Sequence, residues 1–221
     1  MDQPPEPSPA QGTAAPKHLS TPDLYVLSAA TAVVTANAYY IHPIIAVVAD
    51  DFGISHAMIG MVPAFNQIAL ALGILLLLPL GDWVSNRRLT GIFVAAQFVS
   101  VAVMAFAQDY WLFVAGSTVL GFFTIAPYLL PTYVSKRVAP GDLGKATAII
   151  TTGIIAGILL ARAGAGVMGQ YLGWRSVYFV AAALMLAVSV ALPLIMEKRD
   201  SRTVAAPGQS YAGLLLSIGP I

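Results

Sequence analysis

Six long apolar segments limit what this chain can fold into. They cover about residues 24–48, 57–80, 89–108, 110–134, 146–169 and 175–196, and each is close to the ~20 residues that an α-helix needs to cross a bilayer. Hydrophobic residues make up 58% of the 221 residues and charged residues only 10%, which is more apolar surface than a soluble domain of this size can bury. We therefore predict an all-α membrane protein with six transmembrane helices, surrounded by the lipid bilayer.

The two ends of the chain differ from this apolar middle. Residues 1–20 hold five prolines among small and polar residues, so they bury too little apolar area to fold and are expected to form a disordered tail. Residues 197–221 begin as a polar linker and turn apolar only from Tyr211 to Ile221, a run too short to span a membrane. We interpret this run as the truncated start of a seventh helix, so that residues 21–196 lack a C-terminal six-helix half as their partner. The alternative is a six-helix protein that works alone or as a dimer.

The basic residues predict how the helices are oriented. If both termini are cytoplasmic, nine of the 11 lysines and arginines lie on the cytoplasmic side, where membrane proteins carry their excess of positive charge. These nine are Lys17, Arg87, Arg88, Lys136, Arg137, Lys145, Lys198, Arg199 and Arg202. They are spread over several loops and form no single patch, which argues against nucleic acid as a partner.

Four residues are placed to cap predicted helices. Thr21 precedes a proline and an acid, and Ser55, Asp109 and Asp142 stand before the second, fourth and fifth apolar segments. Side-chain oxygens at such positions accept hydrogen bonds from the free N–H groups of a first helical turn. We expect these residues to mark helix starts.

Arg162 is a charged residue inside the fifth apolar segment. An arginine near the centre of a membrane helix costs roughly 2.5–3.5 kcal/mol on insertion scales, so an offsetting role is expected. On a helical wheel Gly153, Gly157 and Gly164 lie on one side, which suits close helix packing, and Arg162 points to the opposite side. We interpret the arginine side as facing a water-filled substrate path. The alternative is that Arg162 extends to the outer interface or bonds backbone carbonyls.

Further polar side chains lie at membrane depth. The candidates for lining a path together with Arg162 are Asn37, Tyr40 and His42 in the first segment, Asn66 and Gln67 in the second, and Ser117 and Tyr128 in the fourth. Prolines interrupt the same segments and free backbone carbonyls, which suits a cavity that changes shape. The alternative for each polar residue is a hydrogen bond between helices, worth about 0.6 kcal/mol.

The distribution of reactive side chains disfavours an enzyme. The chain has no cysteine and three histidines, and His18, His42 and His56 fall in the tail, near the outer end of the first helix and in an outer loop. A serine and a histidine cannot meet as nucleophile and base without unusual folding, and histidines and carboxylates do not cluster as metal ligands would. We expect no catalytic residue, no metal and no cofactor.

The charged turn between the second and third segments carries a family resemblance. Residues 80–88 are similar to the loop between helices 2 and 3 of the major facilitator superfamily (MFS), whose pattern is roughly Gly-x-x-x-Asp-Arg-x-Gly-Arg-Arg. Asp82, Arg87 and Arg88 stand on the charged positions of that pattern, and Trp83 replaces its first arginine.

Three further stretches extend the resemblance over most of the chain. Residues 36–43 resemble the Ala-Asn-x-Tyr-Tyr-x-Gln-Pro segment of bacterial efflux members of the superfamily, with His42 in place of the glutamine. Residues 157–162 are similar to part of the family's fifth helix, and residues 172–175 are similar to the outer loop before its sixth.

The resemblance implies the N-terminal six-helix half of an MFS transporter, built as a 3+3 inverted repeat with both termini cytoplasmic, in a bacterial inner membrane. It also implies alternating access and proton-coupled efflux of a small organic substrate that is drug-, sugar- or nucleoside-like, with Asp82, Arg87 and Arg88 gating the cytoplasmic side. Two departures bear on coupling: Ser117 replaces the arginine usual ahead of Gly121, and the glycine-proline pair of drug antiporters is absent from the fifth helix. The competing classes are a non-transporting receptor or binding protein, a self-associating six-helix membrane protein and a channel.

Overall fold

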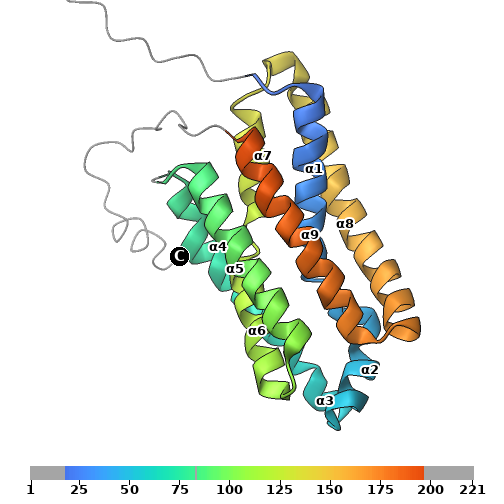
Figure 1. Cartoon of the computed structure of the whole chain (residues 1–221). Helices are drawn as coiled ribbons and strands as arrows, with labels where there is room; N and C mark the ends of the chain where they lie inside the picture. The colour runs from blue at the N-terminus through green and yellow to red at the C-terminus, as the bar shows by residue number, and fades with distance from the viewer. Residues whose placement is uncertain (1–17, 83, 197–221) are drawn as a thin grey trace, which may run out of the picture.

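The computed structural model describes residues 18–82 and 84–196 as a bundle of helices (Figure 1). Within those two ranges the chain contains no strand. Most of the predicted tail and all of the predicted linker, residues 1–17 and 197–221, lie outside the described residues. The helices are α1 (Thr21–Ala36), α2 (Ile41–Phe52), α3 (His56–Ile59), α4 (Met61–Leu77), η1 (Leu78–Asp82), α5 (Asn86–Phe106), α6 (Tyr110–Phe123), α7 (Ala126–Ser135), η2 (Pro140–Asp142), α8 (Leu143–Tyr171) and α9 (Trp174–Ile195).

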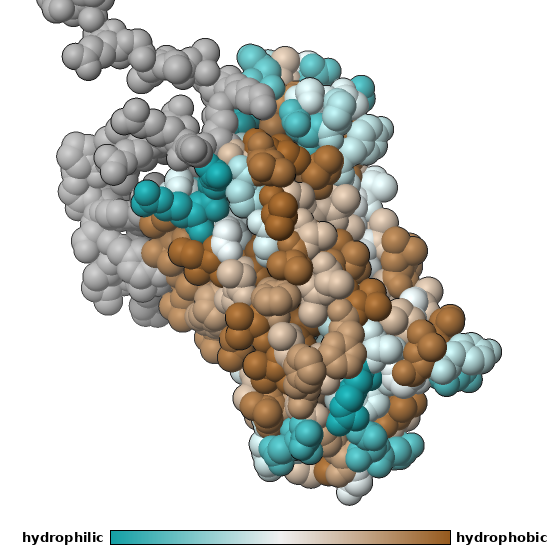
Figure 2. All heavy atoms as spheres, in the orientation of Figure 1, coloured by the Kyte–Doolittle hydropathy of each residue, from teal (hydrophilic) through white to brown (hydrophobic). Residues whose placement is uncertain are grey.

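These helices combine into six stretches that are long and apolar enough to cross a membrane, which we number span 1 to span 6. They are Thr21–Phe52, His56–Gly81, Asn86–Phe106, Tyr110–Ser135, Pro140–Tyr171 and Trp174–Ile195. Each overlaps one predicted segment, so the predicted all-α architecture with six spans is confirmed. On the face drawn in Figure 2, hydrophobic residues form a broad belt and hydrophilic residues gather toward the two ends of the bundle.

The two ends of the bundle hold different turns. The end near the start of α1 also holds the turns at 84–85 and 136–139 and the end of α9, and we call it the terminal end. The opposite end, which we call the far end, holds the turns at 53–55, 107–109 and 172–173. At the terminal end the Leu19 N–H donates to the Arg137 carbonyl oxygen at 3.1 Å, which joins the chain before α1 to the chain after α7.

Helix starts follow local capping chemistry. Ser20, and not the predicted Thr21, is the N-cap of α1, because the Ser20 backbone is extended and its Oγ accepts a hydrogen bond from the Asp23 N–H. Ser55 caps α3 and Asp109 caps α6 through hydrogen bonds from backbone N–H groups, as expected. The aspartate before α8 makes no side-chain capping bond.

The spans pack in a pattern that repeats after three. Span 1 packs along span 5 through α1 and α8, and span 2 packs along span 4 through α4 and α6. Span 3 packs along span 6 through α5 and α9. Spans 1–3 and spans 4–6 form two triplets. If each span is exchanged for its counterpart in the other triplet, the pair of spans 1 and 5 becomes the pair of spans 4 and 2, and the pair of spans 3 and 6 stays the same. The packing is therefore what two equivalent triplets would give. Because a triplet crosses the bundle an odd number of times, the second triplet runs inverted relative to the first.

Small residues let α8 approach α1 closely. A Cβ added to Gly153 would collide with the Ser28 backbone, and one added to Gly157 would collide with the Ala32 backbone. The Ser28 hydroxyl also donates to the Ile149 carbonyl oxygen of α8 at 2.7 Å. Close backbone contact and a hydrogen bond therefore hold spans 1 and 5 together.

Gly164 does not belong to this contact, contrary to the prediction. A Cβ at Gly164 would meet no atom within 4 Å in the described part of the chain. The buried line on α8 continues instead from Gly157 through Ala161 and Ala165. Residues four apart advance about 40° around a helix of 3.6 residues per turn, so the line winds away from Gly164 as α8 crosses α1.

The contact between α4 and α6 uses two residues that were predicted to line a path. A Cβ added to Gly121 would collide with the Asn66 backbone, and Asn66 Nδ2 donates to the Ser117 carbonyl oxygen at 2.7 Å. Asn66 and Ser117 are only 3% and 2% exposed. In this structure they line no open path, and they form the bond between helices that was the alternative for each.

Candidate functional site

Span 1 is interrupted between α1 and α2, where the sequence predicts one continuous helix. Pro43 has no N–H to donate to the Tyr39 carbonyl oxygen four residues earlier. His42 Nδ1 lies 3.3 Å from that oxygen, and because a carbonyl oxygen only accepts, Nδ1 carries the hydrogen in this contact. The His42 side chain thus supplies the donor that the proline lacks.

Span 4 is interrupted in a similar way at Thr124 and Ile125, between α6 and α7. Pro127 leaves the Phe123 carbonyl oxygen without its usual helical donor. Gln97 Nε2 of α5 donates to this oxygen at 2.9 Å, and the Ile125 N–H donates to it at 2.8 Å. The second predicted continuous helix is therefore also two helices, for the same physical reason.

The two interruptions occupy corresponding places in the repeat. Span 1 is the first span of one triplet and span 4 is the first span of the other. Interrupted helices at corresponding positions of two repeats are the best indication of a binding region in membrane transporters. The residues around these interruptions therefore form the candidate site.

Three side chains gather beside the interruption in span 1. Arg162 is exposed on α8, and its Cζ lies over the Tyr39 ring, 5.5 Å from the ring centroid. The Tyr39 ring stacks on His42, with centroids 5.7 Å apart and planes at 26°. We call Arg162, Tyr39 and His42 the Arg162 cluster. It brings a cation, a phenol and an imidazole together from spans 5 and 1.

The position of Arg162 argues against extension to the membrane surface. Arg162 lies nine residues before Tyr171, the last residue of α8, which is about 14 Å at 1.5 Å per residue. Side chains on a helix lean toward its N-terminus, which here is away from that nearer end. A guanidinium over an aromatic ring gains about 0.5–2 kcal/mol. The contact with Tyr39 therefore offsets part of the free-energy cost of placing the Arg162 charge at membrane depth.

The remaining residues predicted to line the path divide into exposed and buried ones. Tyr128 on α7 is 44% exposed, and Gln67 on α4 is exposed. Tyr40 is buried in a hydrophobic cluster, and Asn37 is 3% exposed. Tyr40 and Asn37 therefore line no open path in this structure. A helical wheel does not predict this, because the wheel loses its register where the helix is interrupted.

Sequence reasoning missed Gln97 and Tyr39. Gln97 is 0% exposed midway along α5. The one signal in the sequence that could have indicated its role is that an amide side chain stands in the apolar part of a membrane helix. Tyr39 stands inside the family-like segment 36–43, but its contact with Arg162 depends on how spans 1 and 5 pack.

The turn predicted to gate the cytoplasmic side follows η1. Asp82 ends η1, and its side chain lies outside the described side chains. Arg87 is half-buried and lines a small pocket with Ser189 and Pro193 of α9, and Arg88 is exposed. Both arginines lie at the terminal end of the bundle, and the gating role stays a prediction.

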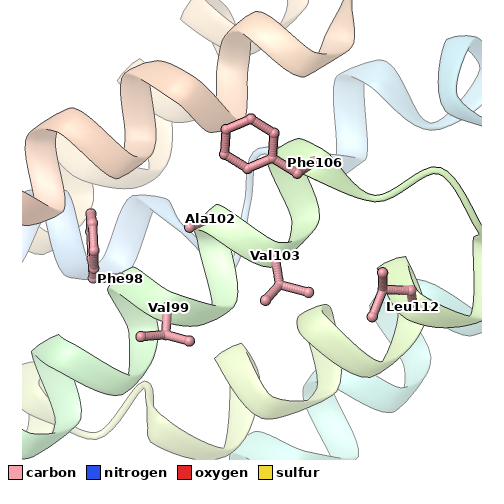
Figure 3. Close-up of a pocket in the computed structure, with 6 residues that line it drawn as sticks. All are labelled: Phe98, Val99, Ala102, Val103, Phe106 and Leu112. Atoms are coloured by element: carbon pink, nitrogen blue, oxygen red, sulfur yellow. The ribbon is translucent and has the colours of Figure 1, made fainter.

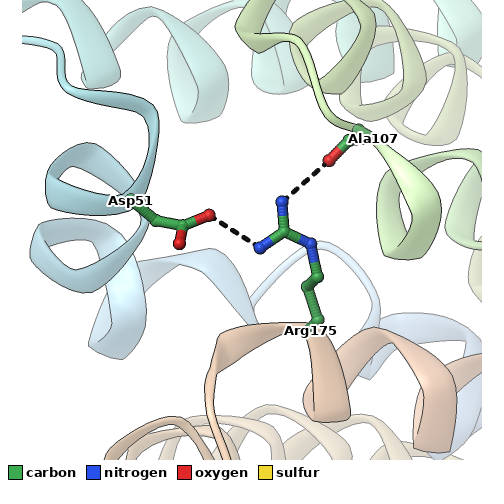
Figure 4. A network of polar contacts seen from close by, with 3 residues as sticks. All are labelled: Asp51, Ala107 and Arg175. Carbon is green, nitrogen blue, oxygen red and sulfur yellow. Dashed lines mark hydrogen bonds and ion pairs between the residues drawn. The ribbon is translucent and has the colours of Figure 1, made fainter.

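At the far end Arg175 joins the ends of three spans (Figure 4). Its Nη1 donates to Asp51 Oδ2 at 2.6 Å, and its Nη2 donates to the Ala107 carbonyl oxygen at 3.0 Å. The guanidinium also lies over the Trp174 ring, 4.2 Å from the centroid. Gly173, with φ of 80°, supplies the left-handed backbone that turns the chain from α8 into α9. Arg175 therefore connects the ends of spans 1, 3 and 6.

A groove along α5 offers no polar side chain to a ligand (Figure 3). It is lined by Phe98, Val99, Ala102, Val103 and Phe106 of α5 and by Leu112 of α6. Ligand sites need a few placed polar groups to orient what they bind. The groove is typical of a surface that faces lipid chains, so we place the candidate site at the Arg162 cluster.

Six spans in two inverted triplets, with matched interruptions in spans 1 and 4, have the architecture of a secondary transporter of the helical, inverted-repeat class. The family model described as Major Facilitator Superfamily matches residues 27–217. The chain belongs to the major facilitator superfamily.

The chain is similar to curated bacterial proteins that are named as transporters. It is 33% identical over 189 residues to the uncharacterized transporter YgaY of Escherichia coli O157:H7, a match that covers 85% of this chain and 48% of that protein. It is 29% identical over 194 residues to the probable transporter SCO4007 of Streptomyces coelicolor, a match that covers 87% of this chain and 44% of that protein. The chain thus spans about half the length of the curated relatives it matches.

Proposed function

We propose that this chain is the N-terminal half of a secondary transporter that exports a small organic molecule by alternating access, in exchange for protons. Family membership, relatives named as transporters and a length about half of theirs support the proposal. In this proposal a C-terminal half supplies the other wall of the substrate path. The substrate class is a drug-, sugar- or nucleoside-like compound.

The Arg162 cluster is the observation that carries the proposal. A guanidinium presents planar N–H groups to two acceptors at once, and a phenol and an imidazole add hydrogen bonds and aromatic faces. The cluster lies beside the interruption in span 1, so a change in that backbone alters what the three side chains can reach. It suits a substrate that carries a carboxylate or another pair of hydrogen-bond acceptors on an apolar body.

His42 is the residue that we propose for proton coupling. An imidazole can take up and release a proton, and histidine commonly serves as a proton shuttle. The aspartates with described side chains lie in the first or last turn of a helix or next to its start; they are Asp23, Asp50, Asp51, Asp109 and Asp142. Both His42 and Arg162 contact the Tyr39 ring, so a proton on His42 adds a second positive charge near Arg162, and the repulsion between the two cations changes the geometry offered to a substrate.

The proposed orientation follows from the arginines at the terminal end of the bundle. Positive charge favours the cytoplasmic side, so the terminal end faces the cytoplasm and the bundle lies in a bacterial inner membrane. Arg87 and Arg88 are at this end. Together with Asp82 they hold the cytoplasmic side closed against the second half in part of the transport cycle.

Flux in vesicles tests the proposal. The protein from the complete gene is reconstituted in liposomes loaded with small organic anions or neutral hydrogen-bond acceptors, and release is followed under an imposed pH gradient while the internal pH is recorded. We expect release of at least one compound to depend on the gradient and to move protons in the opposite direction. Binding without release under any gradient would identify a receptor, and currents far above carrier turnover would identify a channel.

A further inference from the structure

Gln97 connects the two proline interruptions directly. Its Nε2 donates to the Phe123 carbonyl oxygen at 2.9 Å, and its Oε1 accepts a hydrogen bond from Asn37 Nδ2 at 3.2 Å. Phe123 is the last residue before the interruption in span 4, and Asn37 is the first residue of the interruption in span 1. One side-chain amide of span 3 therefore bridges both.

The surroundings of Gln97 make this bridge hard to replace. Gln97 and Asn37 are 0% and 3% exposed, so water from the bulk does not reach their amides in this structure. Pro127 lacks the N–H that would otherwise bond the Phe123 carbonyl oxygen. Loss of the Gln97 side chain would leave buried polar groups on both spans with fewer partners, which is unfavourable.

The hydrogen bonding is incomplete on the span 1 side of the bridge. Asn37 Oδ1 and Thr35 Oγ1 are buried and have no hydrogen-bond partner among the described residues. Buried polar atoms usually find a partner. These two oxygens are therefore free to accept or share a hydrogen bond if the backbone at the interruption changes shape.

We propose that Gln97 is a positioning residue that makes the interruptions in spans 1 and 4 change shape together. A planar amide holds its donor and acceptor in a fixed relation, so a displacement of the Phe123 carbonyl is passed to Asn37. The same bridge thereby ties the first span of one triplet to the first span of the other. The role of this coupling in a transport cycle rests on the proposed function. The coupling itself is tested from distances between spans 1 and 4, without any substrate.

Distances between the interrupted spans test the coupling. Spin labels are placed on cysteines that replace Val47 of α2 and Thr132 of α7, both exposed. The protein from the complete gene is studied in lipid nanodiscs; these 221 residues contain no other cysteine, and any cysteine in the remainder of that protein is first replaced by serine. We expect Gln97→Met, which keeps the side-chain length and removes both hydrogen bonds, to broaden the distance distribution into more than one population.

A double variant and a matched control make this test specific. Asn37→Leu should broaden the distribution as Gln97→Met does, and the double variant should add nothing further, because both changes break one connection. Ser100→Ala is the control, since Ser100 is buried on the same helix but its hydroxyl bonds the Ala96 carbonyl oxygen of that helix at 2.9 Å. The control should leave the distribution unchanged.

An unchanged distribution in folded Gln97→Met would overturn the coupling, even if that variant lost flux. If Gln97→Met does not fold, Asn37→Leu decides in its place, and an unchanged distribution there would overturn the coupling equally. Broadening in the bridge variants, combined with no flux by the native protein for any compound, would support the coupling and reject the transport proposal. The two failures are therefore distinguishable.

Discussion

Arg162 and His42 acquire their proposed roles from the backbone around them. His42 stands before Pro43 and reaches the Tyr39 carbonyl oxygen that the proline leaves free. Arg162 comes from another span and lies over the ring of the same Tyr39. The two side chains thus contact one residue at an interruption, and we expect changes at either to alter transport more than folding.

We expect Arg162→Lys to fold and to transport an anionic substrate at least about tenfold more slowly. Lysine lacks the planar fork that bonds two acceptors at once, and one hydrogen bond to a charged group contributes about 1.5–3 kcal/mol. Arg162→Leu should insert as well as the native protein, since leucine is favourable at membrane depth, and should be inactive. Helix content, surface expression and flux are measured for both. Normal flux in folded Arg162→Leu would remove Arg162 from the substrate path.

His42→Gln keeps a side-chain N–H near the Tyr39 carbonyl oxygen but cannot change its charge. We expect downhill exchange to persist and gradient-driven transport to fall to background, because a glutamine side chain cannot carry the coupled proton. His56→Gln, exposed on α3, is the matched control and should retain gradient-driven transport. Gradient-driven transport by His42→Gln would assign coupling to another residue.

At the scale of the element, prolines and glycines decide how each span is shaped and how closely it packs. Pro43 and Pro127 each remove one backbone donor, and the freed carbonyl oxygens are bonded by side chains. Gly153 and Gly157 lack side chains where α8 meets the α1 backbone. These two glycines lie on span 5, whose α8 is one continuous helix beside the interrupted span 1, so span 1 can bend at its interruption while span 5 stays straight.

Gly157→Val is expected to weaken the contact between α1 and α8. Its Cβ would collide with the Ala32 backbone, which cannot rotate away as a side chain can, and overpacking of this kind costs about 1–3 kcal/mol. Gly164→Val lies on the same helix in open space and should change the unfolding temperature little. Thermal unfolding in one detergent compares the two, and equal destabilisation would contradict the close-packing account.

Arg175→Ala is expected to lower stability more than Asp51→Asn does. Both charged side chains are more than one-third exposed, at 36% and 44%, so solvent screening limits the pair itself to about 0–1 kcal/mol. Arg175→Ala also loses the bond to the Ala107 carbonyl oxygen and the contact with the Trp174 ring. Unfolding at low and high salt separates the contributions, because salt screens the exposed ion pair more strongly than the other two contacts. Equal effects of the two variants would mean that the ion pair alone matters.

At the scale of the whole molecule, the spans differ in how much of their surface the described chain covers. In the most apolar stretch of span 2 and of span 5, only 22% is buried inside the described structure, whereas 61% of the most apolar stretch of span 4 is buried. Apolar surface left open on spans 2 and 5 requires lipid or further protein against it.

Span 3 carries Gln97, so a residue outside the two interrupted spans connects them.

The arrangement of turns predicts which residues lie on each side of the membrane. Ala57 near the far end and Gly141 at the terminal end are both exposed, and each is replaced singly by cysteine. Because positive charge favours the cytoplasmic side, we expect an impermeant maleimide to label Ala57→Cys in intact cells and Gly141→Cys only in opened cells. The opposite pattern would invert the proposed orientation.

Local properties of the chain determined the six spans and their ends. Apolar composition over about 20 residues sets a span, and caps such as Ser55 and Asp109 act within one helical turn. The prolines that interrupt spans 1 and 4 are local features too. The spans and these caps were predicted because each depends on residues that are neighbours in the sequence, whereas a break into two helices at the prolines was not predicted.

Only the tertiary structure decided which polar residues stay exposed and which join helices. Asn37 bonds Gln97 across 60 residues, and Asn66 bonds Ser117 across 51 residues. A helical wheel assigns a residue to a face of its own helix but says nothing of what covers that face. Arg162 stays exposed and Gln97 is buried because of how the spans pack. Hydrogen-bond partners so far apart in the chain meet only once the bundle has formed.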